Sequence, residues 1–212
     1  MTSLYISTPK SVLSDLPIYR FEGKIVVIQS KREVPPAIHM LSKQRIVGID
    51  TETRPSFRKG ITHKVALLQI ATKDVCFLFR LNMTGLTNEI IDFLCNPDII
   101  KVGLSLKDDL QMLNKRAKIQ PANWIDLQNE VKKLGVTDMS LQKIFANLFS
   151  QKISKSAQLS NWESDVLTPA QKTYAATDAQ SCILLYEKIN ELLQTRDFEL
   201  IEEEQITTDD AL

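Results

Sequence analysis

The sequence "RIVGIDTETRPSF", residues 45–57, has the pattern of a buried β-strand that carries two acidic residues. Successive side chains of a strand point to opposite faces, so Asp50 and Glu52 lie side by side on one face. Two like charges repel each other there. Placing them in an apolar strand costs free energy unless a cation, a partner or solvent lies between them. The pattern therefore indicates that a cation, a partner group or solvent lies between these two carboxylates.

The 212 residues suit one large domain, and a hydrophobic content of 43% is enough for a sizeable core. Lys and Arg together number 26, as do Asp and Glu, so the formal net charge is zero. Any affinity for nucleic acid must therefore come from local patches. The chain has no signal-peptide pattern and no apolar run of about 18 residues, so we expect a cytoplasmic protein without membrane association.

The cysteines and histidines narrow the kinds of metal site. Cys76, Cys95 and Cys182 lie far apart in apolar runs, which predicts buried thiols and argues against a disulfide framework or a zinc site. His39 and His63 are the only histidines, which excludes a histidine-rich site. Hard cations with oxygen ligands remain compatible with this composition.

Hydrophobic periodicity predicts strands and helices in a particular order. We expect strands at residues 24–29, 45–52, 64–71, 75–81 and 99–104, and helices at 35–43, 86–95, 106–116, 127–135, 140–149 and 169–196. Ser105 and Asp108 resemble an N-cap and a weak capping box, and Thr168 with Pro169 marks the start of the last helix. The order predicts an α/β domain whose mixed sheet, an antiparallel meander plus parallel strands, is flanked by helices.

No linker or internal repeat divides the chain, so we expect one domain over residues 24–196. Residues 1–23 form an N-terminal extension without a functional signal. Residues 197–212 form an acidic C-terminal tail that we expect to be partly disordered.

Two further places carry acids on elements of the expected core. Asp109 lies in the first turn of a helix directly after a buried strand, where α/β folds build their sites. Tyr174 and Asp178 are four residues apart and share one face of the last helix. Each acid alone has a simpler interpretation, because Asp108 and Asp109 also complement the helix dipole. Together with Asp50 and Glu52, these are four acids and a tyrosine on elements of the core. They cannot all be ordinary surface residues.

The segments "VGIDTE", "KVALLQI", "KVGLSLKDDL" and "SNWESDVLTPAQKTYAATDA" resemble, in order and character, the DEDD exonuclease superfamily in its tyrosine branch. That branch includes ribonuclease D and the exonuclease domain of the Werner syndrome protein, and the chain looks closer to the latter. The resemblance covers residues 46–193. It implies a ribonuclease H-like fold and a 3′–5′ exonuclease that releases nucleoside 5′-monophosphates.

Carried over by motif, the catalytic positions fall on Asp50 and Glu52, on Asp109, and on Tyr174 and Asp178. The resemblance implies that the four acids hold two divalent cations, Mg²⁺ or Mn²⁺, with Asp50 bridging both. Glu52 and Asp178 would complete the site on the nucleophile side, and Asp109 would serve the second ion. Two such ions stabilise the attacking and leaving oxygens of a phosphodiester. Tyr174, with an ordinary pKa near 10, would orient the attacking water.

The expected substrate contacts lie on the loop "TRPSFRKGITHK", residues 53–64. Its basic and aromatic side chains suit phosphate contacts and stacking on a base. The candidate substrate-binding residues are Thr51, Arg54, Phe57, Arg58, Lys59 and Lys64. A solvated hairpin loop is the alternative. Lys152 and Lys155 are a second candidate phosphate-facing edge, whereas Trp162 is expected to be a packing anchor and His63 incidental.

The substrate is expected to be nucleic acid with a free 3′ end. The resemblance to the Werner-type domain favours DNA and a role in DNA repair, and the relationship to ribonuclease D keeps RNA processing as an alternative. A non-catalytic nucleic-acid-binding module on the same fold is a second alternative. No G-x-x-x-x-G-K-[ST] loop occurs, so a helicase or repair partner would be a separate chain. The sequence does not predict an oligomeric state.

Overall fold

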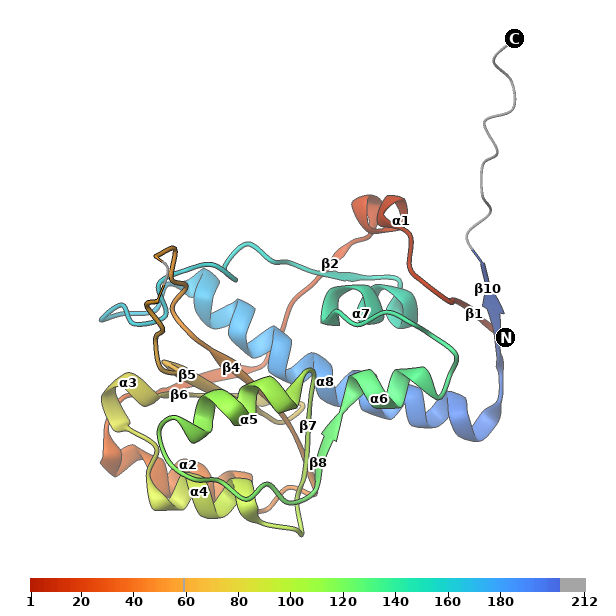
Figure 1. Cartoon of the computed structure of the whole chain (residues 1–212). Helices are drawn as coiled ribbons and strands as arrows, with labels where there is room; N and C mark the ends of the chain where they lie inside the picture. Colours follow the sequence, from red (N-terminus) through yellow and green to blue (C-terminus); the bar gives the residue numbers. More distant parts are fainter. Residues whose placement is uncertain (59, 203–212) are drawn as a thin grey trace.

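A six-stranded mixed sheet organises the chain (Figure 1). Its strand order is β3-β6-β5-β4-β7-β8. The structure is a computed structural model that describes residues 1–58 and 60–202. The strands of this sheet are β3 (Lys24–Ile28), β4 (Ile46–Glu52), β5 (Leu67–Ala71), β6 (Val75–Arg80), β7 (Ile100–Gly103) and β8 (Trp124–Asp126). Strands β4, β5 and β6 form an antiparallel meander. Strand β3 pairs in parallel with β6, and β7 pairs in parallel with both β4 and β8. The expected mixed sheet is confirmed.

The helices are α1 (Lys10–Asp15), α2 (Val34–Leu41), α3 (Leu81–Thr84), α4 (Asn88–Cys95), α5 (Leu106–Asn114), α6 (Leu127–Lys132), α7 (Leu141–Phe149) and α8 (Pro169–Thr195), with a 3₁₀ helix η1 at Lys31–Glu33. Two small parallel sheets complete the fold. One pairs β1 (Thr2–Tyr5) with β10 (Phe198–Ile201), and the other pairs β2 (Ile18–Tyr19) with β9 (Lys152–Ile153).

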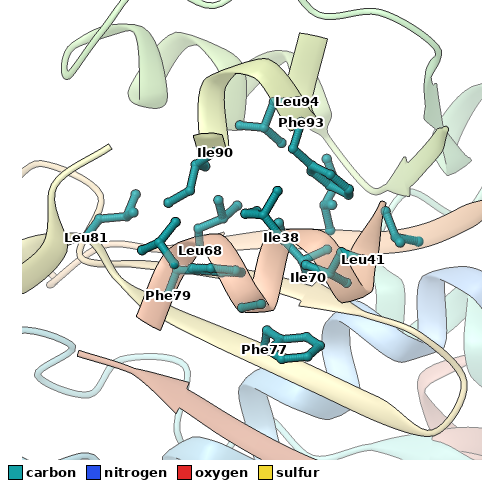
Figure 2. Packing of buried hydrophobic residues seen from close by; sticks show 14 of the residues in the cluster. Ile38, Leu41, Leu68, Ile70, Phe77, Phe79, Leu81, Ile90, Phe93 and Leu94 are labelled. Atoms are coloured by element: carbon teal, nitrogen blue, oxygen red, sulfur yellow. The ribbon is translucent and has the colours of Figure 1, made fainter. Parts of the chain in front are cut away.

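Helices α2 and α4 cover one face of the sheet (Figure 1). Their apolar stripes arise from helical spacing, and Figure 2 shows these side chains meeting those of β5 and β6. The contacting residues include Ile38, Leu41, Ile90, Phe93 and Leu94 from the helices, and Leu68, Ile70, Phe77 and Phe79 from the strands. Burying each large side chain contributes roughly 1.5–3 kcal/mol. This layer keeps β4 and β5 rigid beneath the acidic residues.

The long helix α8 lies against the opposite face and contacts β4, β5, β6 and β7. Its approach to β4 is close, because a Cβ added at Gly48 would lie 1.8 Å from the carbonyl oxygen of Ala179. Ala175, Ala176 and Ala179 are fully buried and keep the helix near the sheet. At its start, the Thr168 hydroxyl accepts a hydrogen bond from the Gln171 N–H, which confirms the expected N-cap.

Both chain ends contain structure that the sequence pattern did not predict. Within the expected acidic tail, Phe198–Ile201 form β10, and within the N-terminal extension, Thr2–Tyr5 form its partner β1. The buried Leu4 and the partly buried Phe198 join the same apolar cluster, which explains the pairing of these short segments. The rest of the expected tail, residues 203–212, lies outside the described residues.

The expected capping box at Ser105 is wrong. Ser105 has a positive φ of 59° and caps no backbone N–H with its side chain. Instead, the Asp126 carboxylate accepts hydrogen bonds from the backbone N–H of Ser105 at 3.2 Å and of Leu106 at 2.9 Å. Asp126 also accepts from the Gln128 N–H at the start of α6. One carboxylate on β8 therefore fixes the start of both α5 and α6.

Cys76 and Cys182 are buried and Cys95 is partly buried, and all three are free thiols, as expected. Among the described residues, no helix combines the length and the apolar character that a membrane crossing needs.

Candidate active site

The two acids of β4 lie on the face that α8 covers. Gly48, Asp50 and Glu52 alternate with residues of the opposite face, and Gly48 touches α8 directly. One α8 residue, Asp178, reaches the same place. Carboxylate oxygens of Asp50, Glu52 and Asp178 lie within 4.8 Å of one another. The predicted convergence of the first and third acidic motifs is therefore present in the fold.

Asp109 reaches the site from α5 and is held differently. The Thr51 hydroxyl, between Asp50 and Glu52 on β4, donates a hydrogen bond to Asp109. Asp109 is not one of the three acids whose oxygens fall within 4.8 Å of one another. The start of α5 is fixed by Asp126, as described above. The second acidic motif is thus tied to the first through a side chain of the strand itself.

Tyr174 lies one helical turn before Asp178 and lines the same cavity. Its ring packs beside that of Trp162, with ring centroids 6.0 Å apart. Trp162 is fully buried, which confirms its expected role as a packing anchor. This packing limits the rotation of the Tyr174 ring and holds its hydroxyl toward the acids.

The acids open into a cavity of about 350 Å³. Asp50, Glu52, Tyr174 and Asp178 form one wall. The remaining wall comes from the start of α7 and from the segment after β9, and it includes Met139, Gln142, Ser154, Lys155 and Gln158. The volume suits a nucleotide-sized group, because small-ligand sites measure roughly 300–1,000 Å³.

Burial raises the pKa of all four acids, and repulsion by the other acids of the site adds to it for Asp50 and Glu52. Burial is the largest cause of the raised pKa of Asp50, followed by the charges of Asp109, Glu52 and Asp178. Burial and the same kind of repulsion raise the pKa of Glu52 to about 9. For Asp109 and Asp178, burial raises the pKa to about 6 and about 7. Without a cation, Asp50 and Glu52 therefore resist ionisation at neutral pH, whereas Asp109 and Asp178 ionise at a higher pH than ordinary aspartates do.

Burial and the neighbouring carboxylates also raise the pKa of Tyr174 well above its ordinary value. The nearby cation Lys155 acts in the opposite direction on Asp178 and lowers the pKa of that carboxyl. Tyr174 is consequently a neutral hydroxyl at physiological pH and acts through hydrogen bonds.

The donor set fits a hard divalent cation. Only carboxylate oxygens converge, and these are the ligands that Mg²⁺ and Mn²⁺ favour. One oxygen of Asp178, Oδ1, is buried and has no hydrogen-bond partner within the described part of the chain. A buried polar atom without a partner costs free energy, and a cation between the acids would remove that cost.

The predicted substrate loop lies beside the site, but its side chains do not line the 350 Å³ cavity within the described chain. Arg54 pairs with Glu163 at 3.3 Å, and His63 approaches the same carboxylate at 3.4 Å. Phe57 is 86% exposed, and Arg58 and Lys64 are also exposed. Lys59 lies outside the described residues. Thr51 lines the cavity while its hydroxyl serves Asp109.

The two lysines of the second candidate edge differ. Lys155 lines the cavity, whereas the Lys152 ammonium donates to the Ser14 carbonyl oxygen at 2.5 Å. Met139, Gln142 and Gln158 also line the cavity and were not expected from the sequence. They come from loops and from the start of α7. No local sequence pattern predicts that these segments lie near β4.

Comparisons with known proteins agree with this geometry. Residues 25–194 match the family model described as "3'-5' exonuclease". The mouse protein "Bifunctional 3'-5' exonuclease/ATP-dependent helicase WRN" is 30% identical over 198 residues, which cover 88% of this chain and 14% of that relative. The chain thus spans a small part of that relative.

Two solved structures share the fold. The Nibbler EXO domain of Aedes aegypti has a TM-score of 0.77 and 20% identity, covering 85% of this chain and 95% of that domain. Escherichia coli RNase D has a TM-score of 0.73 and 17% identity, covering 81% of this chain and 46% of that protein. The family model extends over the acidic residues of β4, α5 and α8, and the fold is that of these nucleases. The chain therefore belongs to the 3′–5′ exonuclease family.

Proposed function

We propose that this chain hydrolyses nucleic acid from the 3′ end by a metal-dependent mechanism, releasing nucleoside 5′-monophosphates. The observation that carries the proposal is the convergence of Asp50, Glu52 and Asp178 oxygens within 4.8 Å of one another, in a cavity that Tyr174 also lines. Membership of the exonuclease family supports it. No catalytic position of the family pattern is substituted in this sequence.

The four acids Asp50, Glu52, Asp109 and Asp178 would hold the cations, for which we propose Mg²⁺ or Mn²⁺. Asp50 lies between the other acids and is the candidate bridging ligand, because the charges of all three act on it. Bound divalent ions supply charge stabilisation for the attacking and leaving oxygens of the phosphodiester. Thr51 keeps the Asp109 carboxylate oriented for this role.

In the reaction, the oxygen of a water molecule attacks phosphorus and the bond to the 3′ oxygen of the preceding nucleotide breaks. The strand then ends in a new 3′ hydroxyl, and the released nucleotide keeps the phosphate on its 5′ oxygen. Tyr174 is neutral, so we propose that its hydroxyl orients the attacking water by hydrogen bonding. The buried Trp162 beside it holds this orientation.

The substrate contacts extend over the loop that follows β4. We propose that Arg54, Arg58 and Lys64 contact phosphates and that the exposed Phe57 stacks on a base, with Lys59 on the same loop. Contacts to phosphates and base faces carry little sequence information. We therefore expect weak sequence preference.

We propose DNA as the first substrate to examine, because the sequence resembles the Werner-type domain more than ribonuclease D. RNA is the second candidate, and the shared fold with Escherichia coli RNase D, an exoribonuclease involved in structured RNA processing, supports testing it. We propose that residues 24–196 form the exonuclease domain, in agreement with the extent of the family match. A separate helicase or repair partner is part of the same proposal.

The deciding experiment is digestion of 3′-recessed DNA and single-stranded RNA of matched sequence, with Mg²⁺, Mn²⁺ or EDTA. We expect stepwise 3′ trimming with either ion, none with EDTA, and none by Asp50→Ala. Release of 5′-monophosphates identifies the bond that breaks. Absence of trimming on both substrates with every ion would favour a nucleic-acid-binding module without catalysis.

A further inference from the structure

A second cavity of about 290 Å³ adjoins the active-site cavity. The two cavities share Ile153, Ser154 and Tyr174 as lining residues. A ligand that extends out of the first cavity across this shared wall therefore enters the second. The new lining residues include Tyr19 and Arg20, both from the N-terminal extension.

The second cavity has the chemistry of an anion site. Arg20 is its single charged lining residue within the described chain, and no acid lines it. Ser154, Ser156 and Thr173 add hydroxyl groups, whereas the Thr177 hydroxyl donates to the Thr173 carbonyl oxygen. A guanidinium with neighbouring hydroxyls suits the oxygens of a phosphate, which arginine recognises through its fork of N–H donors. The first cavity, in contrast, is dominated by carboxylates.

The backbone on both sides of Arg20 is held in place. Tyr19 pairs with Ile153 in the β2–β9 sheet, and its hydroxyl donates to Gln180 Oε1 at 2.9 Å. The Phe21 N–H donates to the Thr177 hydroxyl of α8 at 3.0 Å. The Arg20 side chain is exposed and forms no ion pair with any described acid. Its charge is therefore available to a ligand, on a fixed backbone.

We propose that this second cavity binds a backbone phosphate of the substrate strand, on the 5′ side of the linkage that is cleaved, with Arg20 as the main contact. The inference rests on the proposed exonuclease function, and it makes the N-terminal extension part of the substrate site. A dinucleotide has a single linkage, which occupies the carboxylate cavity. Longer strands also place a phosphate against Arg20.

The test compares single-stranded DNA of two lengths, a dinucleotide and an octanucleotide, in Mg²⁺. For Arg20→Gln we expect the ratio of kcat/KM for the octanucleotide to that for the dinucleotide to fall about tenfold, as for one lost charge-assisted hydrogen bond. Arg20→Lys should restore part of this ratio. The control Lys10→Gln removes a positive charge from the same extension at an exposed position that lines neither cavity, and should preserve the ratio.

A second readout locates the phosphate. A neutral methylphosphonate at the second linkage from the 3′ end should weaken octanucleotide binding to wild type and have little further effect on Arg20→Gln. An unchanged length ratio in Arg20→Gln, or an equal loss on both lengths, would overturn the inference. If wild type cleaves neither DNA nor RNA, the proposed function fails. Octanucleotide binding in Ca²⁺ then tests Arg20 independently, and equal affinity of wild type and Arg20→Gln would overturn its role.

Discussion

The hydroxyl of Thr51 on β4 donates a hydrogen bond to the carboxylate of Asp109 on α5. Thr51 lies between Asp50 and Glu52 but points to the other face of the strand. A single residue thereby connects the acids of β4 with the acid of a helix from the opposite side of the strand. This connection would set the direction in which Asp109 approaches a cation at the proposed metal site.

Removing this hydroxyl should reduce catalysis while leaving the fold intact. Thr51→Val keeps the shape of the side chain but deletes the donor, and we expect kcat to fall about 10- to 100-fold, as for other groups that orient metal ligands. Thr51→Ser keeps the hydroxyl and should retain most of kcat. Steady-state kinetics with Mn²⁺ titration measures both, and equal activity of the valine variant and wild type would contradict the orienting role.

The contact between Gly48 and α8 predicts a large effect of one methyl group. Gly48→Ala places a Cβ 1.8 Å from the Ala179 carbonyl oxygen, so β4 or α8 must shift. We expect a loss of about 1–3 kcal/mol in the free energy of unfolding, together with lost activity, because Asp178 moves with α8. Urea denaturation measures the first effect.

Gly85→Ala is a suitable comparison for that measurement. Gly85 has a φ of 70°, and an added Cβ meets no atom within 4 Å. Its expected cost of about 1–3 kcal/mol comes from backbone strain alone, because its ψ is −179° and this combination of φ and ψ is essentially restricted to glycine, and its activity should remain. If Gly48→Ala kept full activity, the proposed dependence of the site on close helix packing would be wrong.

The raised pKa values of the acids predict how stability depends on pH without metal. The pKa is about 6 for Asp109, about 7 for Asp178 and about 9 for Glu52, all above their ordinary values. Between about pH 4 and 9 the folded state therefore binds more protons than the unfolded state, so the free energy of unfolding falls as pH rises. Thermal denaturation in EDTA across this range measures the trend.

Divalent cations should reverse this trend. Binding requires deprotonated carboxylates, so the increase in Tm caused by Mn²⁺ should be larger at pH 8 than at pH 6. Asp50→Asn cannot ionise, so at about pH 9, where Asp109 and Asp178 are ionised, it should raise the Tm of the metal-free protein by about 2–4 °C per kcal/mol gained, while reducing the Mn²⁺ effect. An Asp50→Asn protein that is less stable than wild type in EDTA would contradict the repulsion at the site.

Tyr174→Phe separates orientation from metal binding. The variant keeps the ring that packs beside Trp162 and loses the hydroxyl. We expect kcat to fall at least tenfold with little change in the Mn²⁺-induced increase in Tm, since Tyr174 is not an acid ligand. Activity within about twofold of wild type would refute the positioning role.

Glu163 allows the two possible roles of Arg54 to be distinguished. Arg54 pairs with Glu163 at 3.3 Å, and both groups are partly exposed, so the pair itself contributes little to stability. If Arg54 contacts phosphate, Arg54→Gln should raise KM several-fold, whereas Glu163→Gln should leave KM unchanged or lower it about twofold. An equal increase in KM for both variants would instead assign the pair to holding the loop.

Local sequence patterns were enough to predict the strands around the meander and the start of α8, and the resemblance of the motifs to a known family supplied the five candidate catalytic residues. Periodicity is a local property, so it shows that Asp50 and Glu52 share one face of a strand and that Tyr174 and Asp178 share one face of a helix. The order of the four motifs along the chain then gave the resemblance to the exonuclease family. Their catalytic roles rest on that resemblance. Ser105 occupies the N-cap position of α5 as predicted, but the predicted capping box is wrong because the capping carboxylate comes from Asp126 on β8, 20 residues after Leu106.

Which side chains and strands from distant segments come together depends on the tertiary structure. The short β1, β2, β9 and β10 have too few residues to show a period, and each depends on a partner far away in the chain. The same pairing brings Arg20 beside the cavity next to Tyr174. The connection between Thr51 and Asp109 likewise depends on how α5 packs against β4. Local pattern specifies the elements and their chemistry, whereas long-range packing sets the distances on which a metal site and a substrate path depend.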